Sequence, residues 1–490
     1  MLFNSWIFII FFAVTLAGLL ILKRTKFWLL WLLIASYFFY GWLNPLYLIL
    51  IGYSTVITYI AAIMIEKSKT SPPGLQPSPS PPAERGSGGE VLKSKKRKLW
   101  LGIAIANSLI LLGFFKYAAF AAENLNHLAE LLSLPLWLNQ GVKIPKPGFL
   151  LPVGISFYTF ISMGYIIDVY RKKIPAERNI IRCAAFISFF PYLLAGPIER
   201  AQNMLPQLSK APRITADNLT EGISLFVVGL FKKIALADFL ALYANKVFGD
   251  PSQYPGLASL LATYAFAWQI YFDFSGYTDM ARGAARMLGF NLMLNFDNPY
   301  LSTSLGEFWR RWHISLSSWF KDYLYIPLGG NRHGRFRTHL NMVITMLVAG
   351  LWHGAAWNFI IWGALHALGR VVTRELELTS FYSERIPKIV KQIAIFHFVC
   401  LTWIFFRAET FGKAVVMLKG IFTFTLTDPK FSIAALIFMG AVLLYQYLYE
   451  SRFRTILEHS MVKVGLMLTM ILYMIFFRTS GYEIFLYFRF

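Results

Sequence analysis

Long apolar runs separated by short polar segments dominate the chain. Runs of this length match the roughly 20 residues that a helix needs to cross the hydrocarbon core of a bilayer. The pattern therefore predicts an all-α polytopic membrane protein with about ten to eleven transmembrane helices plus re-entrant and interfacial pieces. It excludes an outer-membrane barrel, whose strands are short and alternating. The runs cover about residues 5–22, 27–43, 46–65, 99–122, 222–248, 257–281, 339–368, 390–406, 431–449 and 462–478.

Three segments depart from this pattern. Residues 66–98 combine a stretch rich in proline, serine and glycine with the basic run Lys93–Lys98, which predicts a disordered loop. Residues 183–198 are apolar but interrupted by Pro191, so we expect a re-entrant segment buried against protein. Residues 304–325 mix aromatic and charged side chains without a proline, which predicts one amphipathic helix at the membrane interface.

The proline-rich loop divides the chain into amino-terminal transmembrane helices at 1–65 and a membrane core at 99–490. Basic clusters at 23–26, 66–98 and 171–182 are each separated by two spans, so all three lie on the same side. By the positive-inside rule that side is the cytoplasm. We therefore expect a multi-pass protein of the inner or plasma membrane, with the amino terminus outside and the first run retained as a signal anchor.

Composition agrees with a lipid environment. Hydrophobic residues make up 57% and charged residues 15% of the chain, against roughly 45–50% and about 25% in soluble domains. The formal net charge of +22 would suggest nucleic acid as the partner of a soluble protein. Because the basic residues mostly lie between apolar runs, orientation in the membrane explains them, and lipid is the expected partner. The two cysteines, Cys183 and Cys400, lie in apolar runs and exclude a disulfide framework.

Ionisable groups inside apolar runs are the candidates for chemistry, because such groups are expensive in lipid. His353 lies in the run 339–368 between Gly350 and Gly354, where small residues leave room for a ligand or a close helix neighbour. An imidazole titrates near neutrality and suits proton transfer. In one continuous helix His366 would be rotated about 220° from His353, which favours packing for His366.

Other polar groups are weaker candidates. Anchoring at the interface explains His313 as well as catalysis does. Asp273 and Asp279 would lie about 240° apart on a helix, which predicts a buried hydrogen-bond network or a polar channel lining. A cluster of arginines is suited to the phosphates of a nucleotide-bearing or carrier-bound donor: Arg310, Arg311, Arg332, Arg335 and Arg337. No HEXXH, GXSXG or Walker motif occurs, so the sequence favours neither a metal site nor a serine hydrolase or nucleotide-binding loop.

Several collinear blocks together resemble the membrane-bound O-acyltransferase family, in its bacterial branch of alginate O-acetyltransferases and D-alanyl transfer proteins. The resemblance runs from about residue 150 to the carboxyl terminus, and the first 150 residues are similar mainly in hydropathy. The blocks are LPVGISFYTF (151–160), FFPYLLAGPIER (189–200), YFDFSGYTDMA (271–281), FWRRWHISLSSWFKDYLYIPLGGNR (308–332), LWHGAAWNFIIWGALH (351–366) and the closing IFLYFRF.

The resemblance implies a ring of helices around a central funnel, where an acyl thioester from the cytoplasm meets an acceptor from outside. It implies acetyl-CoA as donor substrate, with an acyl carrier protein thioester as the second choice, and no bound cofactor. The acceptor would be an extracytoplasmic polysaccharide or an SGNH-type acyltransferase partner. The family's histidine in its WHG motif falls on His353, and the one in its WHIS motif falls on His313.

Chemistry and resemblance agree on a hypothesis for the mechanism. His353 is the general base for the acceptor hydroxyl, and His313 orients the donor or stabilises charge. Trp312, Trp357 and Asn358 are expected to shape the pocket, although packing explains Trp357 equally well. An acyl-histidine intermediate is also compatible with the sequence. The alternatives are a transporter or flippase of an acyl-linked lipid or glycan, with His353 as proton relay, and a scaffold for polysaccharide export.

Overall fold

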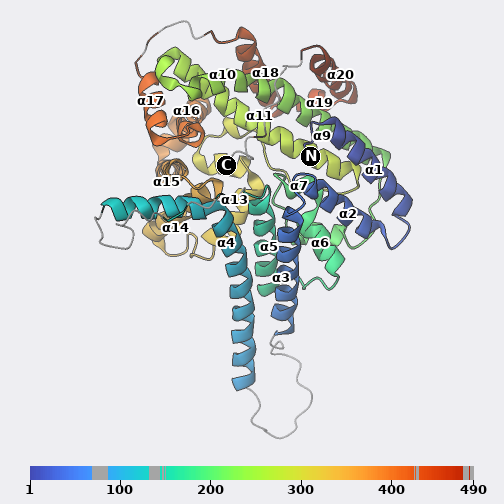
Figure 1. Ribbon diagram of the computed structural model, residues 1–490. Coiled ribbons are helices and arrows are strands. Elements are labelled where there is room, and N and C mark those ends of the chain that lie inside the picture. The colour runs from blue at the N-terminus through green and yellow to red at the C-terminus, as the bar shows by residue number, and fades with distance from the viewer. Residues whose placement is uncertain are drawn as a thin grey trace. The chain divides into compact units, whose positions relative to one another are not determined.

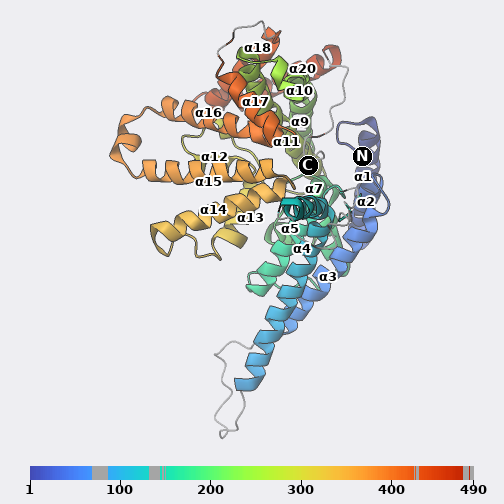
Figure 2. The same cartoon turned by 60° about the vertical axis from the view of Figure 1, so that its left-hand side comes forward.

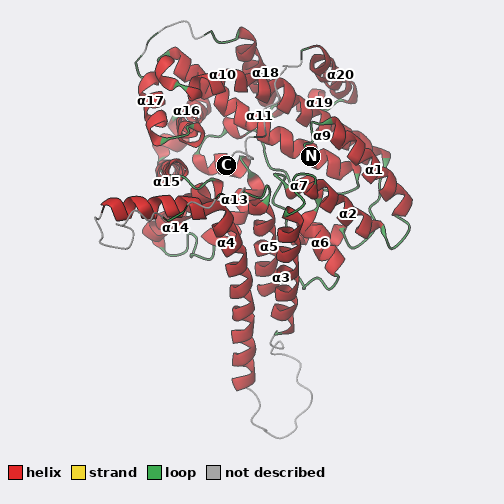
Figure 3. Cartoon of the chain, in the orientation of Figure 1, coloured by secondary structure: helices red, strands yellow, loops and turns green. Residues whose placement is uncertain are grey.

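The computed structural model describes residues 1–68, 87–131, 144–145, 148, 151–423, 425, 430–477 and 485. These residues form helices joined by turns and extended segments, and contain no strand (Figure 1; Figure 3). The all-helical fold predicted from the apolar runs is therefore confirmed for the described residues. The chain divides into two compact units, one formed mainly by residues 7–213 and the other mainly by residues 214–490.

The first unit contains eight helices among its described residues. Figures 1 and 2 both show α3 lying beside α4, and α5 packs against both. The helices are α1 (Trp6–Leu22), α2 (Trp28–Gly41), α3 (Tyr47–Lys67), α4 (Ser87–Leu131), α5 (Ile155–Tyr170), α6 (Ile180–Ser188), α7 (Phe190–Leu193) and α8 (Ala201–Gln207).

A broken, buried segment forms the centre of this unit. Helix α6 ends at Ser188 and α7 begins at Phe190, because Pro191 lacks the amide hydrogen that would continue the helical ladder. Every residue from Cys183 to Leu194 is buried. Phe190 N donates to Ser36 Oγ of α2 at 3.1 Å. The prediction of an interrupted segment buried against protein is confirmed here, while its re-entrant path in a membrane stays a prediction.

The loop expected over 66–98 is too long at both ends. Helix α3 continues to Lys67, and α4 begins at Ser87 and includes the whole basic run. Lysine and arginine are good helix formers, so the basic run extends the apolar helix that follows it. Arg97 stacks its guanidinium on the Tyr170 ring at 4.9 Å, which further orders this end of α4. Residues 69–86 lie outside the described residues.

The second unit contains the long helices α11, α14, α15 and α16, and Figure 2 shows α14 and α15 as an antiparallel pair. Its α-helices are α9 (Ala216–Phe231), α10 (Asp238–Gly249), α11 (Leu257–Met287), α12 (Leu305–Arg311), α13 (Ile314–Phe320), α14 (Gly334–His353), α15 (Trp357–Glu377), α16 (Lys388–Arg407), α17 (Phe411–Ile421), α18 (Ile433–Tyr449), α19 (Arg454–Leu457) and α20 (Ser460–Phe476). The π-helical turns are η2 (Lys232–Ala237), η5 (Lys321–Tyr325) and η6 (Phe381–Arg385), and the 3₁₀ turns are η3 (Pro251–Gln253) and η4 (Pro299–Leu301).

Close backbone contact between α9 and α11 depends on four glycines. Gly222 and Gly229 on α9 face Gly283 and Gly276 on α11. A Cβ added at Gly222 would lie 2.8 Å from Gly283 O, and one added at Gly276 would lie 2.7 Å from Gly229 O. Each pair is spaced by seven residues, which keeps both glycines on one helix face. Small residues at these positions allow α11 to be buried along most of its length.

Three described helical segments are long and apolar enough to cross a membrane: Tyr47–Lys67, Leu92–Leu131 and Lys388–Arg407. Five shorter apolar helices, of 10–17 residues, accompany them: α1, α2, α5, α18 and α20. The expected total of ten to eleven spans and the ring of helices stay predictions.

Two helices predicted as continuous are broken, and both predictions were wrong. The expected amphipathic helix over 304–325 divides at His313 into α12 and α13, and the run 339–368 divides between α14 and α15. His313 adopts a left-handed backbone with φ 43°. At the second break Gly354 is extended, with φ −166°. Both candidate histidines therefore lie at helix breaks.

Candidate active site

His353 is the last residue of α14, directly before the break. Its side chain is 5% exposed and is enclosed by the rings of Trp352, Trp362 and Phe406, whose centroids lie 5.0, 5.1 and 5.2 Å from that of His353. A Cβ on Gly350 would collide with the backbone carbonyl of Phe359 on α15. The small residues beside His353 therefore allow a close helix neighbour, which was one of the two roles expected for them.

His313 forms the turn between α12 and α13. Ser304 caps the start of α12: its Oγ accepts from Glu307 N at 3.2 Å, while the Glu307 carboxylate accepts from Thr303 N at 2.8 Å. This arrangement resembles a capping box and fixes the start of the helix. Helix α12 ends before His313, whose left-handed backbone cannot continue an α-helix. For a residue other than glycine this conformation costs about 1–2 kcal/mol. Such strain persists only where neighbouring contacts compensate for it.

Asn295, in the segment between α11 and α12, supplies those contacts. Its Oδ1 accepts from Ser315 N at 3.2 Å and from Ser315 Oγ at 2.9 Å, and it lies 3.1 Å from His313 Nδ1. Its backbone carbonyl accepts from Ile314 N at 2.9 Å. Because a backbone N–H can only donate, the atom facing Ser315 must be the amide oxygen. His313 Nδ1 is therefore the donor, and in the neutral ring Nε2 carries the lone pair.

Burial keeps the His313 ring neutral. The side chain is fully buried, with the Phe274 ring 4.7 Å away and the Trp352 ring 6.1 Å away. Removal of the imidazolium from water lowers the pKa of His313 to about 3. At neutral pH its Nε2 can therefore accept a hydrogen bond. It cannot donate to an oxyanion from that nitrogen without first gaining a proton.

Two tryptophans connect the three buried histidines of this unit. The Trp352 ring contacts both His313 and His353. The Trp362 ring lies 5.1 Å from His353 and 4.7 Å from His366. The 220° separation expected for the last two was wrong, because the break between α14 and α15 reverses the chain. His366 Nε2 is hydrogen-bonded to Thr402 Oγ1, 2.9 Å away. Through Trp362 it belongs to the same aromatic group as His353.

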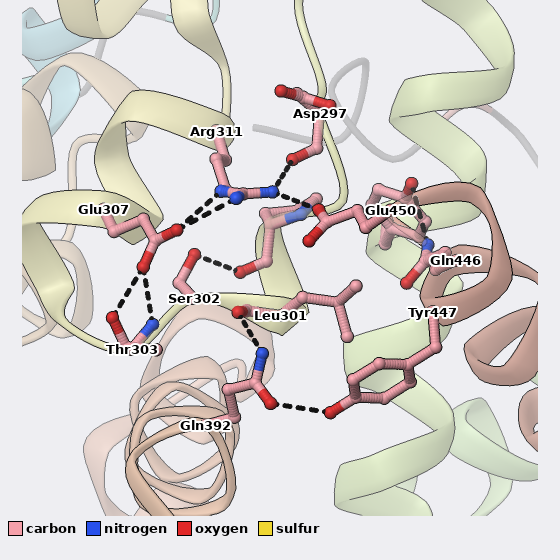
Figure 4. A network of polar contacts seen from close by, with 12 residues as sticks. Asp297, Leu301, Ser302, Thr303, Glu307, Arg311, Gln392, Gln446, Tyr447 and Glu450 are labelled. Atoms are coloured by element: carbon pink, nitrogen blue, oxygen red, sulfur yellow. Dashed lines mark hydrogen bonds and ion pairs between the residues drawn. The ribbon is translucent and has the colours of Figure 1, made fainter. Parts of the chain in front are cut away.

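Arg311 and Arg310 differ although they are adjacent. Arg311 lies 2.9 Å from Glu307, and it also pairs with Glu450 at the end of α18 (Figure 4). Its Nη1 donates to Asp297 O at 3.3 Å. These partners neutralise Arg311 and attach α12 to α18, so the structure gives it a fixed place within the protein. Arg310, by contrast, is exposed.

The three residues expected to shape the pocket differ in how far they are buried. Trp312 is 1% exposed, stacked on Phe308 with centroids 5.6 Å apart and 5.0 Å from the Trp403 ring. Protein rings therefore occupy its faces. Trp357 is 59% exposed at the start of α15. Asn358 is buried, and its Nδ2 donates to Ala408 O at 2.8 Å, which attaches the start of α15 to the end of α16.

The two aspartates of α11 are paired with lysines of the π-helical turn η2. Lys233 Nζ lies 2.8 Å from both Asp273 and Asp238, and Lys232 Nζ lies 2.6 Å from Asp279. The expectation that the α11 aspartates do not form one carboxylate pair agrees with these contacts. Asp273 is next to Phe274, which contacts His313, but its carboxylate is directed to Lys233. Among the described residues, no group of His, Cys, Asp and Glu side chains is arranged to hold a metal ion.

Sequence reasoning missed Asn295, Trp362, Thr402 and Arg370. A buried asparagine in a segment between helices has no distinctive sequence signal, and a tryptophan or threonine within an apolar run is expected as ordinary packing. Arg370 had one usable signal, because it follows His366 by four residues and therefore lies near the same helix face.

Comparison with known proteins decides the family. Residues 170–408 match the model of the membrane-bound O-acyltransferase family. The "Probable alginate O-acetylase AlgI" of Pseudomonas aeruginosa is 40% identical over 424 residues, which cover 86% of this chain and 75% of that protein. The chain belongs to the membrane-bound O-acyltransferase family. It is an acyltransferase, and both His313 and His353 lie inside the matched region.

Other relatives of this acyltransferase carry different names. The "Peptidoglycan O-acetyltransferase" of Helicobacter pylori is 34% identical, with 86% of this chain and 79% of that protein covered. The "Teichoic acid D-alanyltransferase" of Bacillus subtilis is 28% identical, with 53% of this chain and 69% of that protein covered. These names share the transfer of an acetyl or D-alanyl group, to alginate, peptidoglycan or teichoic acid.

Proposed function

We propose that this acyltransferase moves an acetyl group from a cytoplasmic thioester to a hydroxyl of an extracytoplasmic polysaccharide, directly or through a partner acyltransferase. The observation that carries the proposal is the buried group in which Trp352 joins His313 to His353. Acetyl is favoured over D-alanyl because the relatives covering most of this chain are named as acetylating enzymes. The acceptor is given only as a class, since their names specify different polymers.

In the proposed reaction His353 is the general base. It takes the proton of the acceptor hydroxyl while the oxygen attacks the thioester carbonyl. The new O–C bond forms, the C–S bond breaks, and the thiolate that leaves is protonated. The enclosing rings of Trp362 and Phe406 exclude water, which would otherwise hydrolyse the thioester.

His313 has a separate role in this proposal. A pKa of about 3 makes it a poor base at neutral pH, which favours His353 for proton abstraction. With Nδ1–H bonded to Asn295, the lone pair of Nε2 accepts a hydrogen bond and orients a hydroxyl or the donor. Of the two roles expected for His313, the structure supports orientation over stabilisation of negative charge.

A transfer assay with the full-length protein in lipid vesicles tests this proposal. Vesicles receive acetyl-CoA labelled in the acetyl group and an acetylatable polysaccharide, and acetyl ester on the polymer is counted. His353→Ala is expected to lower the rate by roughly 10²–10⁴-fold, the usual contribution of a general base. His459→Ala is the matched control, since His459 is exposed ahead of α20 and lies outside the aromatic group.

The melting temperature in detergent is measured for each variant, so that misfolding is separated from lost chemistry. Full transferase activity in a folded His353→Ala protein would contradict the assignment of the base. Polymer or lipid flux without acetyl ester formation by the wild type would instead favour the transporter.

A further inference from the structure

Three arginines cluster where α12 meets α15: Arg310, Arg370 and Arg374. Arg370 and Arg374 are one turn apart on α15, and both Arg374 and Arg310 are close enough to Arg370 to repel it electrostatically. Among the described residues, one carboxylate pairs with Arg370, that of Glu377 at 3.8 Å. In the described part of the chain neither Arg310 nor Arg374 forms an ion pair. The cluster therefore has an excess of positive charge.

The Arg370 guanidinium is held against backbone instead of extending into solvent. A Cβ added at Gly306 of α12 would lie 2.8 Å from Arg370 Cζ and 2.9 Å from its Nη2. The side chain is 22% exposed, and its buried Nη1, although 3.8 Å from Glu377 Oε2, makes no hydrogen bond in the structure. A partly desolvated guanidinium with an unused donor is costly unless an anion satisfies it.

A ridge of α15 connects this cluster to the candidate active site. Trp362, His366, Arg370 and Arg374 are four residues apart in succession, which is the spacing of a helix ridge. The ridge begins at Trp362, beside His353, and ends at Arg374. At a rise of 1.5 Å per residue these two ends are about 18 Å apart. Helix α12 follows it, since Trp309 contacts both Trp362 and His366. Uncharged rings therefore lead from the candidate base to the arginines.

The arginine end of the ridge lies at the basic end of the α14–α15 pair. The Glu375 carboxylate of α15 forms an ion pair with Arg335, and its Oε1 lies 2.9 Å from His339 Nε2. Arg335 and His339 are both near the start of α14. Basic segments of this kind mark the cytoplasmic side of a membrane protein. A thioester donor from the cytoplasm would therefore reach the arginines before its sulfur reaches His353.

We infer that Arg370, with Arg310 and Arg374, binds the phosphate at the far end of the phosphopantetheine arm of the thioester donor. This inference rests on the proposed function. The arm is a long uncharged chain with the thioester at one end and a phosphate at the other. The order of side chains along α15 fits it, because uncharged rings lie between the candidate base and the arginine cluster. Guanidinium groups suit phosphate because their donors match its oxygens. The same arm occurs in coenzyme A and on acyl carrier proteins.

Three donors that differ in phosphate content test the inference: acetyl-CoA, S-acetyl-4′-phosphopantetheine and S-acetylpantetheine, which has no phosphate. For Arg370→Gln in vesicles, KM for the two phosphorylated donors is expected to rise roughly 10- to 100-fold, the loss of a charge-assisted contact. KM for S-acetylpantetheine is expected to stay within about twofold of the wild type. Arg454→Gln is the control, because Arg454 is exposed, pairs with Glu458 and belongs to no group of residues expected to bind the donor.

Other outcomes overturn the inference. An equal rise in KM for all three donors would assign Arg370 a structural role, and an equal effect of Arg454→Gln would assign the preference to general surface charge. The KM defect of Arg370→Gln is also compared in vesicles with and without anionic lipid. A defect that appears only with anionic lipid would show that the cluster binds a lipid headgroup instead of the donor. A wild-type protein inactive with every donor would overturn the proposed function itself.

Discussion

Asn295 determines which nitrogen of His313 carries the proton. Because its Oδ1 also faces the backbone amide of Ser315, the amide cannot turn round and offer its NH₂ group instead. The imidazole is thus held with Nε2 as acceptor, in a turn that His313 could not adopt cheaply by itself. Asn295 is a positioning residue in this reading, since it acts on the reaction through His313.

Substitution of Asn295 tests this role. Asn295→Leu removes the acceptor and is expected to lower the transfer rate roughly 10- to 100-fold, as for other groups that orient a reactive imidazole. Asn295→Asp keeps the acceptor but places a carboxylate beside Nδ1–H, which favours imidazolium and raises the pKa of His313 from about 3. Because imidazolium cannot accept at Nε2, the acidic limb of the pH–rate profile should move to higher pH.

Ser315→Ala is the matched control, since it removes a different bond to the same Asn295 oxygen. It is expected to leave the acidic limb in place. A pH–rate profile that is the same in Asn295→Asp as in the wild type would contradict the positioning role.

For single residues, the sequence predicts which side chains belong to the candidate site but not which partners they contact. His313 and His353 could be singled out from their motifs and apolar surroundings. The adjacent pair Arg310 and Arg311 could not be told apart, because the distinction depends on Glu450, which is more than a hundred residues away. Long-range partners of this kind leave no local pattern.

Helix breaks are the main elements that place the histidines. The break at His313 has neither proline nor glycine, so local propensity predicts a continuous helix there. Long-range hydrogen bonds, above all those to Asn295, stabilise the turn instead. The break after His353 had a local signal in Gly354, but the surrounding apolar run obscured it. Sequence patterns therefore predicted where helices occur more reliably than where they end.

The contact between α14 and α15 gives an element-scale prediction. A Cβ at Gly350 would collide with Phe359 O, and one at Gly363 would lie 2.6 Å from Met346 O. Gly350→Ala and Gly363→Ala must therefore separate the helices, at a cost of about 1–3 kcal/mol for overpacking. Because His353 and Trp362 lie on these two helices, both the melting temperature and the transfer rate should fall.

Gly440→Ala provides the control for that experiment. Gly440 lies within α18, and nothing comes within 4 Å of an added Cβ. Alanine is the better helix former by up to about 1 kcal/mol, so the melting temperature should stay the same or rise. Wild-type stability and rate in Gly350→Ala would show that the close helix contact is not required.

For the whole molecule, hydropathy predicted the all-helical membrane class but not the path of each helix. Helix α2 has 14 residues and α1 has 17, so each is shorter than the roughly 20 residues that span a bilayer without adjustment. Membrane thinning, tilt of neighbours or a hairpin within the membrane would each accommodate such lengths. The number of spans therefore depends on packing and lipid, which composition alone does not specify.

Cysteine labelling tests the predicted orientation of the first two helices. Native Cys183 and Cys400 are both buried, so they should not react with a membrane-impermeant maleimide. Thr25 lies in the connection between α1 and α2, and Asn44 lies in the connection between α2 and α3. If the amino terminus is outside, Asn44→Cys should react in intact spheroplasts, whereas Thr25→Cys should react only after the membrane is opened.

The native chain labelled under the same conditions is the control for both variants. Reaction of Thr25→Cys alone in intact spheroplasts would reverse the orientation, and with it the side from which the donor reaches the arginine cluster. Equal reaction of both cysteines from outside would show that α2 does not cross, because a spanning helix must separate its two connections. The expected result instead requires a 14-residue helix, about 21 Å long at 1.5 Å per residue, to span a locally thinned bilayer.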